Sequence, residues 1–584
     1  MTWLKPGRLP HGHSFQGWLF LVPLMVTTIV VIVLPTLATV AFSLTDWSGF
    51  GEVTFIGLEN FRQLATDASF LQSLKHAVIW TVIFLTVPIL MGLLGAVLLS
   101  EAGRLQTFFK LVYFIPVTLA SVINAHIWRS LYDPFRGVGA VLDGLGIPFL
   151  AKVAFLGEKN LALHAVAWVD VWRWWGFLVV VFLAAMQAIN PELYDSAKVD
   201  GASWWLEIRH VTLPGIRVTL LFVVLITIVG SLNVFDYVYI LTQGGPAGAT
   251  EVPVTLLYKS AFQKYEAGYA AATRNNHVLP QRAGPGWVSA ASAHGMGRMT
   301  ADVTVGTVTR RWNLRRALLV YVPLVILAIV AVGPVLVLLF NSLKTGREIV
   351  QDPLGLPDAP QLANYARAWR QGRFESTMRN SAILTAGSVT GVCIISGLAA
   401  YALGRLRVRG SRGVVTYLFL ATTAPAPLYV IPLFFMWTRL GQINSLSGLI
   451  IIYWGVLSPF GTLLLRSFLL SLPPELEDAG RVDGASEIRV LLSIILPLSW
   501  PGFVVVGLIT ALGTWNEFFF ANTFIHSQRL KPVTISLLSF QHQFSNDWEL
   551  TSAASVIAVG PVVALFLVFQ RRFIAGMTAG GLRG

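Results

Sequence analysis

A polar segment of thirteen residues occurs twice in this chain, once in each half. The first copy begins at Pro191 with the sequence PELYDSAKVDGAS, and the second begins at Pro474 with PELEDAGRVDGAS. Each copy is followed after the same interval by a Leu-Pro pair, at Leu213 and Leu496, so one constant offset relates the two copies. A repeat with this period has the size of a domain, and we therefore expect two related halves.

Long apolar runs surround both copies. The chain has 584 residues, of which 55% are hydrophobic and only 12% are charged, and its mean hydropathy is +0.67. This composition is typical of proteins that cross the membrane many times. We therefore predict an all-α polytopic membrane protein with five spans in the first half and six in the second. The predicted spans are 18–42, 77–100, 108–131, 161–187, 216–241, 317–340, 382–403, 415–437, 449–470, 498–525 and 553–569.

The charge and the cysteine content exclude several other classes of protein. The net charge of +13 fits Lys and Arg residues on cytoplasmic loops that face anionic lipid. Nucleic-acid binding is not indicated, because the sequence has no pattern of basic residues interleaved with aromatic ones. A single cysteine, Cys393, excludes a disulfide framework and a cysteine-based metal site. The sequence has no phosphate-binding loop of the Gly-x-x-x-x-Gly-Lys-Ser/Thr type, so we expect no ATP hydrolysis and no cofactor in this chain.

The repeated segment has the signals of a short helix followed by a bend. In the first copy, Asn190 can cap a helix, Pro191 suits its first position, and Glu192 and Asp195 complement the positive helix N-terminus. Gly201 is then expected to end that helix, and Gly484 is expected to end the helix of the second copy. For a single copy, a well-capped surface loop is a sufficient interpretation. Two copies in the same register between membrane spans favour a functional one.

Both copies resemble the Glu-Ala-Ala loop of ATP-binding-cassette importer permeases, in particular the binding-protein-dependent carbohydrate class with its maltose-type pair of permeases. In that family an acid begins an acid-Ala-Ala triplet, a Gly follows, and Ile-x-Leu-Pro closes the loop. The triplets match only loosely here, and Asp stands for Glu in both, whereas the Asp-Gly-Ala and Leu-Pro elements match well. The residues expected at the contact with an ATPase are Glu192, Asp195, Ala197, Asp200, Gly201, Ala202, Glu475, Asp478, Ala479, Asp483, Gly484 and Ala485.

The resemblance implies the partners and the location of the protein. It predicts two ATPase subunits or domains, each receiving one loop, and an extracytoplasmic solute-binding protein that delivers a carbohydrate. ATP-driven closure of the ATPases would pull the two loops together and switch the pathway. The protein would lie in the cell membrane of a prokaryote, in contact with lipid. The particular sugar cannot be inferred from the sequence.

The middle of the chain departs from the family pattern. The family would show a sixth span after Tyr269, but no apolar run of spanning length occurs from Thr273 to Asn313. We predict a first permease domain at 1–272, a polar linker at 273–312 and a second permease domain at 313–584. If the N-terminus is cytoplasmic, as we expect, five spans leave the end of the first half outside the cell. The basic cluster at 310–316, however, should lie inside. A fusion of two neighbouring permease reading frames explains this conflict.

Polar residues inside the predicted spans suggest a solute pathway. Asp170 and Arg173 are three residues apart, which favours a local ion pair. The tryptophans around Arg173 either stack on a sugar ring or form an interfacial belt, and the belt is the simpler expectation. In the fifth span of each half, amide, acid and aromatic side chains align at the same offset, a combination that suits a carbohydrate. These candidates are Asn233, Phe235, Asp236, Trp515, Asn516 and Glu517. Hydrogen bonding between helices explains the same placement.

Two other functions are compatible with parts of the sequence. A proton-coupled secondary sugar transporter would use Asp170, Asp236 or Glu517 as its proton site, but it leaves the twin loops unexplained. A non-functional fusion of two permease reading frames would not assemble with an ATPase. We predict the fused translocation pore of an ATP-driven carbohydrate importer, which is not itself an enzyme.

Overall fold

The described part of the chain is helical. The computed structural model describes residues 12–144, 146–147, 152–278, 314–406, 408–543 and 547–581, and no strand occurs among them apart from an isolated bridge between Thr45 and Phe55. The helices of the first half are α1 (Gly12–Thr28), η1 (Ile29–Val33), α2 (Leu34–Phe42), α3 (Glu59–Thr66), α4 (Ala68–Ser100), η2 (Gly103–Leu105), α5 (Gln106–Thr118), α6 (Ser121–Leu131), α7 (Val138–Gly144), α8 (Lys159–Gln187), α9 (Pro191–Val199), α10 (Trp204–Glu207), η4 (Ile208–Thr212), α11 (Leu213–Gly215), α12 (Arg217–Ser231), α13 (Asp236–Leu241), α14 (Pro253–Phe262) and α15 (Ala267–Val278).

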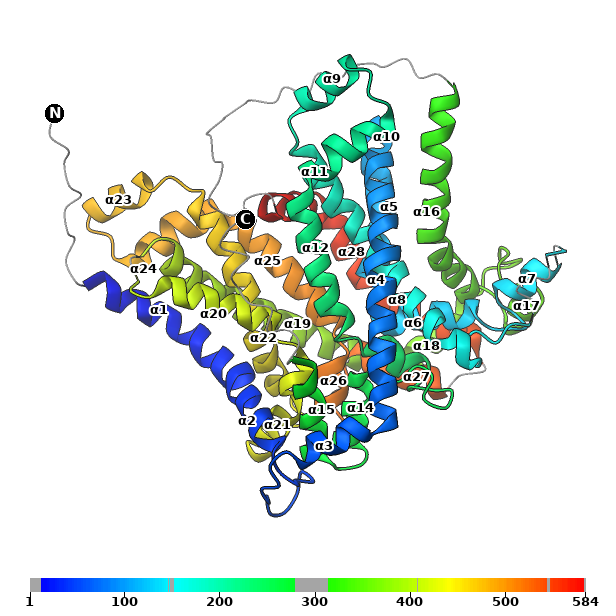
Figure 1. Cartoon of the computed structure of the whole chain (residues 1–584), viewed down its shortest axis with the longest axis horizontal. Helices are drawn as coiled ribbons and strands as arrows, with labels where there is room; N and C mark the ends of the chain where they lie inside the picture. The colour runs from blue at the N-terminus through cyan, green and yellow to red at the C-terminus, as the bar shows by residue number, and fades with distance from the viewer. Residues whose placement is uncertain are drawn as a thin grey trace.

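The second half has a related series of long helices (Figure 1). Its helices are α16 (Leu314–Ser342), α17 (Gly346–Gln351), α18 (Ala363–Gln371), α19 (Phe374–Gly404), α20 (Ser411–Thr423), α21 (Ala426–Arg439), α22 (Leu446–Leu470), α23 (Glu475–Val482), α24 (Glu487–Val490), η7 (Leu491–Ile495), α25 (Leu496–Asn516), α26 (Phe519–Phe524), α27 (Val533–Gln543) and α28 (Trp548–Gly581).

The number of membrane-spanning segments agrees with the prediction. Within the described residues, nine helices are long and apolar enough to cross a bilayer, and two further bent pairs bring the number to eleven. Five of these segments precede residue 279 and six follow residue 313. The all-α polytopic fold with five and six spans is therefore confirmed for the part of the chain that the structure describes.

Two of the predicted spans are sharply bent. α5 and α6 meet at 98° around Leu119 and Ala120, and α20 and α21 meet at 90° around Ala424 and Pro425. Leu119 and Ala120 have extended backbones, and so does Ala424, as is usual for a residue that precedes a proline. An apolar run read from the sequence shows its length but not such a break.

The first helix of each half packs against the other half. α1 lies against α19 and α22, and α16 lies against α4 and α5. One tyrosine of each half holds the exchanged helix: the hydroxyl of Tyr113 in α5 donates to the Leu324 carbonyl oxygen (2.7 Å), and the hydroxyl of Tyr417 in α20 donates to Thr28 Oγ1 (2.6 Å). The two halves therefore interlock instead of merely touching.

The same hydrogen-bonded loop lies beyond the first helix of each half. The Asn60 side chain donates to the carbonyl oxygens of Ser43 and Thr45, at 3.0 and 2.9 Å. Asn364 does the same with Ser342 and Lys344, at 3.1 and 2.8 Å. Both asparagines are buried, so these bonds satisfy carbonyl groups that follow a helix end. The duplication thus extends to the face opposite α9 and α23.

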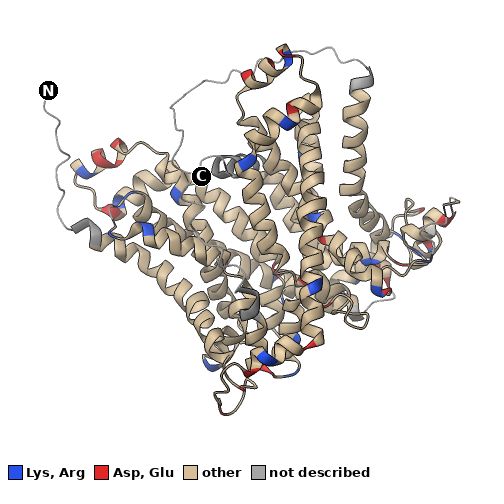
Figure 2. Cartoon of the chain, viewed as in Figure 1, with Lys and Arg blue, Asp and Glu red and all other residues tan. Residues whose placement is uncertain are grey.

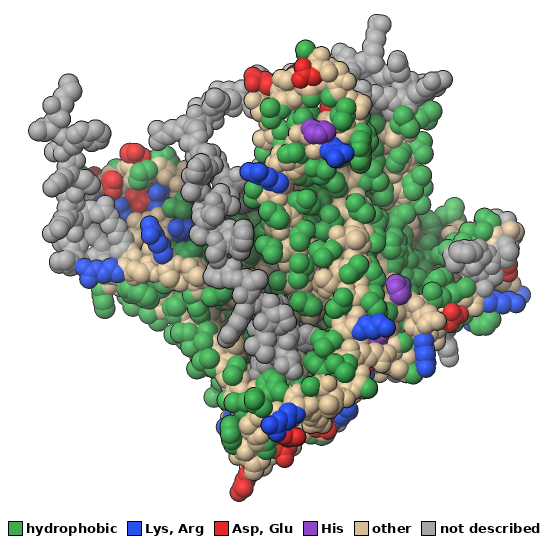
Figure 3. Space-filling model, viewed as in Figure 1, with side chains coloured by type: hydrophobic (Ala, Val, Ile, Leu, Met, Phe, Trp, Pro, Cys, Tyr) green, Lys and Arg blue, Asp and Glu red, His purple; other side chains and the backbone are tan. Residues whose placement is uncertain are grey.

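The distribution of charged and apolar residues over the surface fits a protein in a lipid bilayer. Charged residues gather at the two ends of the long helices, with few between them (Figure 2). Hydrophobic side chains cover the helices between these ends (Figure 3). Leu221 on α12 and Leu319 on α16, for example, are 63% and 73% exposed. Apolar side chains exposed at this depth favour contact with lipid over contact with water.

The end of the first half begins like the end of the second. α15 starts in the register of α28, because the offset that relates the two polar segments also places Glu266, Ala270 and Ala271 on Glu549, Ala553 and Ala554. α15 begins at the α2–α3 loop, where Gly268 N donates to the Trp47 carbonyl oxygen (2.8 Å). α16 begins on the other face, the one that carries α9 and α23 (Figure 1). The predicted linker falls almost entirely on residues 279–313, which lie outside the described residues.

This arrangement predicts the sidedness of four exposed positions. In a protein whose Cys393 is replaced by Ala, cysteines introduced by Val199→Cys and Val482→Cys should react with a membrane-impermeant maleimide from the same side. Phe55→Cys and Leu356→Cys should react from the other side, because these exposed residues lie in the loops that follow the first membrane-crossing helix of each half. Labelling of sealed vesicles of both orientations measures this. Reaction of Val199→Cys and Val482→Cys from opposite sides would contradict the fold.

Candidate coupling loops and translocation pathway

The first repeated segment forms the capped helix that its sequence indicates. The Asn190 side chain accepts a hydrogen bond from Glu192 N (3.1 Å), and Pro191 occupies the first helical position of α9. The helix ends at Gly201, whose φ of +76° is a conformation that glycine adopts without strain. Ala202 N then donates to the Ala197 carbonyl oxygen (2.9 Å), which closes a Schellman motif.

The second segment ends in the same way. α23 stops before Gly484, whose φ is +80°. Ala485 N donates to the Gly480 carbonyl oxygen (3.0 Å), and Gly484 N donates to that of Arg481 (3.0 Å). These bonds are the counterparts, at equivalent positions of the repeat, of the bonds made by Ala202 and by Gly201. The prediction that Gly201 and Gly484 end the two short helices is confirmed.

The elements that follow also keep this register. A one-turn helix, α10 or α24, leads into a π-helix, η4 or η7, and then into a long helix that enters the membrane. η4 covers residues 208–212 and η7 covers 491–495, so the two π-helices are related by the same offset as Pro191 and Pro474. π-helices are rare and often occur at functional sites. The repeat is therefore one of backbone geometry as well as of sequence.

The two segments lie on one face of the molecule (Figure 1). Val199 and Val482, at equivalent positions, are each 87% exposed, and Leu193 and Leu476 are exposed as well. Most of the predicted contact residues are also exposed; Ala197, Ala202 and Ala485 are half-buried. Exposed apolar side chains beside acids on a polar loop are typical of a protein interaction surface.

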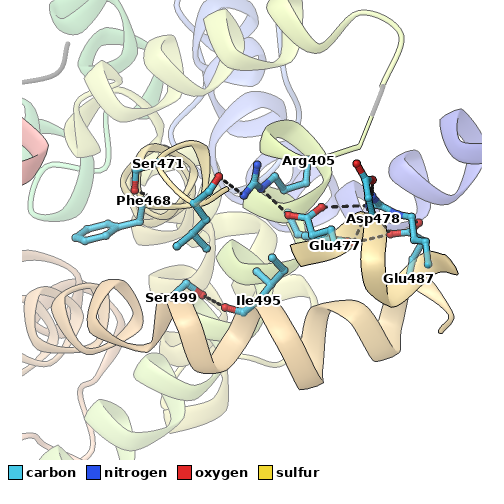
Figure 4. A network of polar contacts seen from close by, with 11 residues as sticks. Arg405, Phe468, Ser471, Glu477, Asp478, Glu487, Ile495 and Ser499 are labelled. Carbon is cyan, nitrogen blue, oxygen red and sulfur yellow. Dashed lines mark hydrogen bonds and ion pairs between the residues drawn. The ribbon is translucent and has the colours of Figure 1, made fainter. Parts of the chain in front are cut away.

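The second segment carries an ion-pair network that the sequence did not indicate (Figure 4). Arg405 Nε lies 2.7 Å from Glu477 Oε1, and Arg481 Nη2 lies 3.2 Å from Glu477 Oε2. Arg481 also pairs with Glu487 (2.9 Å), whose other oxygen accepts a hydrogen bond from the Tyr401 hydroxyl. Burial raises the pKa of Glu477, against the lowering effect of the two guanidinium groups. Arg405 and Glu477 are far apart in the sequence, and their spacing gave no signal of this pair.

The predicted pathway residues lie where the fifth span of each half is interrupted. α12 stops at Ser231 and α13 begins at Asp236, while α25 stops at Asn516 and α26 begins at Phe519. The two breaks face one another across the interface between the halves, because the Phe235 ring contacts those of Phe518 and Phe519, with centroids 6.5 and 4.9 Å apart. The structure therefore brings Phe235 of the first half next to the segment that follows Trp515, Asn516 and Glu517.

Most polar groups at these breaks have partners within the protein. Asn516 Nδ2 donates to the Thr118 carbonyl oxygen across the interface (2.9 Å), Asn233 donates to the Val229 carbonyl oxygen of its own helix, and Trp515 Nε1 donates to that of Ala558 (3.4 Å). Glu517 accepts from the Tyr453 hydroxyl (2.7 Å) and from two backbone N–H groups at the start of α26. Asn516 and Glu517 therefore stabilise the packing of helices in this conformation.

The charged residues of α8 form the expected local pair. Asp170 Oδ1 lies 3.6 Å from Arg173 Nε. The expectation of an interfacial belt is wrong for Trp172 and Trp175, because both side chains are fully buried. Trp172 Nε1 donates to the Val330 carbonyl oxygen of α16 (2.7 Å), so this tryptophan holds the helix exchanged from the other half.

The fold and these loops define an internally duplicated, polytopic membrane protein. The profile of the family described as "Binding-protein-dependent transport system inner membrane component" matches the chain twice, over residues 88–273 and 393–579. The chain therefore belongs to this family and is an inner-membrane permease component of an ATP-binding-cassette transport system. The first match ends at residue 273, where the apolar sequence of the first half also ends.

The alignments with two relatives each cover less than half of the chain. The sulfoquinovosyl glycerol transport system permease protein SmoH of Agrobacterium fabrum (strain C58) is 34% identical over 260 residues, which are 44% of this chain and 91% of SmoH. The diacetylchitobiose uptake system permease protein NgcG of Streptomyces coelicolor is 30% identical over 262 residues, 44% of this chain and 87% of NgcG. A structural alignment with one chain from the crystal structure of a bacterial ABC transporter involved in the import of alginate covers 45% of this chain and 99% of that chain, at 23% sequence identity and a TM-score of 0.41.

Replacement of Glu517 should destabilise the protein, because its carboxylate accepts three hydrogen bonds. Glu517→Ala leaves the Tyr453 hydroxyl and two N–H groups without an acceptor and should lower the free energy of unfolding by roughly 1–3 kcal/mol, whereas Glu517→Gln, which keeps an acceptor oxygen, should lower it less. Thermal unfolding of the detergent-solubilised protein measures this, with Glu475→Ala as the control at an exposed acid. Equal effects of Glu517→Ala and Glu475→Ala would contradict the structural role of Glu517.

Proposed function

We propose that the chain is the fused translocation pore of a carbohydrate importer, and that the loops around α9 and α23 couple it to ATPase subunits in the cytoplasm. The observation that carries this proposal is the repeated backbone geometry of the two loops on one face. Two equal docking elements fit a pair of ATPases related by twofold symmetry, because each element requires the same partner surface. Permeases of this family receive their energy from such a separate ATPase.

The proposed contact residues are those that the sequence predicts in each loop. Glu192, Asp195, Asp200 and Val199 project from α9 and its bend, and the equivalent side chains project from α23. Exposed acids attract a basic groove, and the exposed valine supplies apolar area at its centre. The residues that the sequence predicts are Glu192, Asp195, Ala197, Asp200, Gly201, Ala202, Glu475, Asp478, Ala479, Asp483, Gly484 and Ala485, and Val199 and Val482 are added to them because they are exposed.

A carbohydrate is the proposed solute. Amide and acid groups form hydrogen bonds with vicinal hydroxyl groups, and aromatic faces cover the apolar side of a sugar ring. Asn233, Phe235, Asp236, Trp515, Asn516 and Glu517 supply these groups at the interface between the halves. The names of SmoH and NgcG, which concern sulfoquinovosyl glycerol and diacetylchitobiose, support a sugar or a related solute for this chain.

The proposed assembly has one further partner. A solute-binding protein would deliver the sugar to the face opposite α9 and α23, since the family is described as binding-protein-dependent. Within the chain, we propose a first permease domain at 1–272, a linker at 273–312 and a second permease domain at 313–584. The pairing of two related domains in one chain would replace the two separate permease subunits of a heterodimeric importer.

Proline substitution at the two bends tests the coupling. Gly201→Pro and Gly484→Pro cannot keep a φ near +80°, so both bends should change and each variant should lose most of the ATPase that co-purifies with the intact chain. Gly51→Pro is a matched control, because Gly51 also has a φ of +76° with open space around it but lies on the opposite face.

The amount of cognate ATPase recovered per permease from membranes is the measurement. Equal recovery for Gly201→Pro, Gly484→Pro and Gly51→Pro would contradict a coupling role. Recovery of no ATPase with the intact chain would instead indicate a fusion that does not assemble. Uptake that needs no ATPase and that an uncoupler abolishes would indicate a proton-coupled transporter.

A further inference from the structure

The two loops share their backbone geometry but differ in how they are attached to the membrane helices. None of the side chains of α9, a helix that the structure describes in full, is buried, whereas Glu477 and Gly480 of α23 are. Arg405, which follows the last residue of α19, reaches Glu477 and also donates to the Leu472 carbonyl oxygen at the end of α22 (2.7 Å). The second loop is thus held to two membrane helices of its own half.

The Arg405–Glu477 pair lies at the centre of this attachment (Figure 4). The two side chains are only 8% and 3% exposed, and Arg481 closes the other side of the Glu477 carboxylate. Removal of one partner of a buried pair leaves the other as an uncompensated charge. A buried pair with short contacts on both carboxylate oxygens therefore fixes the orientation of α23 relative to α19.

The first loop has other residues at the equivalent positions. Tyr194 stands where the second loop has Glu477, and its hydroxyl lies 3.0 Å from Thr212 Oγ1 of the same loop. Lys198 stands in place of Arg481 and pairs with Asp195 at 3.4 Å, with both side chains well exposed. Trp204 replaces Glu487 and is exposed. Within the described residues, the ion pair of α9 stays inside its own loop.

We propose that the two coupling loops have unequal roles: α23 is latched to its membrane domain by Arg405 and Glu477 and transmits ATPase movement directly, while α9, which has no such buried ion pair among the described residues, transmits it through its chain connections. This inference rests on the proposed function. Glu477 and Arg405 act as positioning residues, because neither is exposed enough to touch an ATPase. The latch passes a movement of α23 to α19, which packs along α22 and α25.

Spin labels at matched positions test the latch in the permease alone. In a protein with Cys393→Ala, labels attached after Val482→Cys or Val199→Cys sit on residues that are equally exposed in the structure. The label at position 482 should be the less mobile of the two. Glu477→Gln should raise its mobility to that of the label at position 199, and Arg405→Lys, which keeps the charge, should raise it less. Equal mobility in the parent protein, or no effect of Glu477→Gln, would overturn the inference.

Two controls separate a lost latch from misfolding. Lys198→Gln breaks the exposed pair of the first loop and should leave the label at position 199 unchanged, because that pair is screened by solvent. A label introduced by Leu356→Cys on the opposite face should keep its mobility in Glu477→Gln if the fold is intact. A change at position 356 equal to that at position 482 would overturn a local latch.

The consequence for coupling is measured in the reconstituted complex with its ATPase. Glu477→Gln should retain ATP hydrolysis and lose most solute transport, so that more ATP is hydrolysed per solute moved. An unchanged ratio, with the label released at position 482, would overturn the transmitting role. If no ATPase binds the parent permease, the proposed function fails, while the label mobilities still decide whether α23 is latched.

Discussion

The absence of water in the hydrocarbon layer is the constraint on which the rest of this structure depends. A backbone N–H or C=O group without a partner there costs several kcal/mol, by order of magnitude, so the chain crosses the layer as helices. Irregular backbone is tolerated only where protein surrounds it. The interruptions after Ser231 and Asn516 obey this rule, because they lie at the interface between the halves, where Glu517 accepts the N–H groups of Phe520 and Ala521. The same breaks bring polar and aromatic side chains together at the interface between the halves, where we propose the solute pathway.

Duplication explains why these features occur in pairs. The Schellman bends, the π-helices, the asparagine-bonded loops and the exchanged first helices each appear once per half. The two halves also differ in two places. α15 starts like α28 but its described part ends at Val278, and Glu477 has a buried partner where Tyr194 has only a loop hydroxyl. The two loops therefore have the same backbone geometry but differ in how their side chains are attached to the rest of the protein.

Much of this architecture could be predicted from the sequence. Hydropathy located the spans of the described residues, and the helix caps and glycines located both bends, because these signals are local. The right-angle bends at Leu119 and Ala424 were missed, since an apolar run has the same composition whether straight or bent. The burial of Trp172 and Trp175 was missed because it depends on a helix from the other half. The Arg405–Glu477 pair was missed because Glu477 stands beside the exposed Asp478 and differs from it only through tertiary contacts.

The central claim is that α9 and α23 approach one another when ATP closes a pair of ATPases. The most direct measurement is the distance between spin labels attached to Val199→Cys and Val482→Cys in the Cys393→Ala background, determined by pulsed electron resonance in the reconstituted complex. The structure, with the two loops well apart on one face (Figure 1), predicts a distance that shortens when non-hydrolysable ATP is added. A distance distribution that stays the same with and without the nucleotide, in a complex that binds it, would contradict the coupling function.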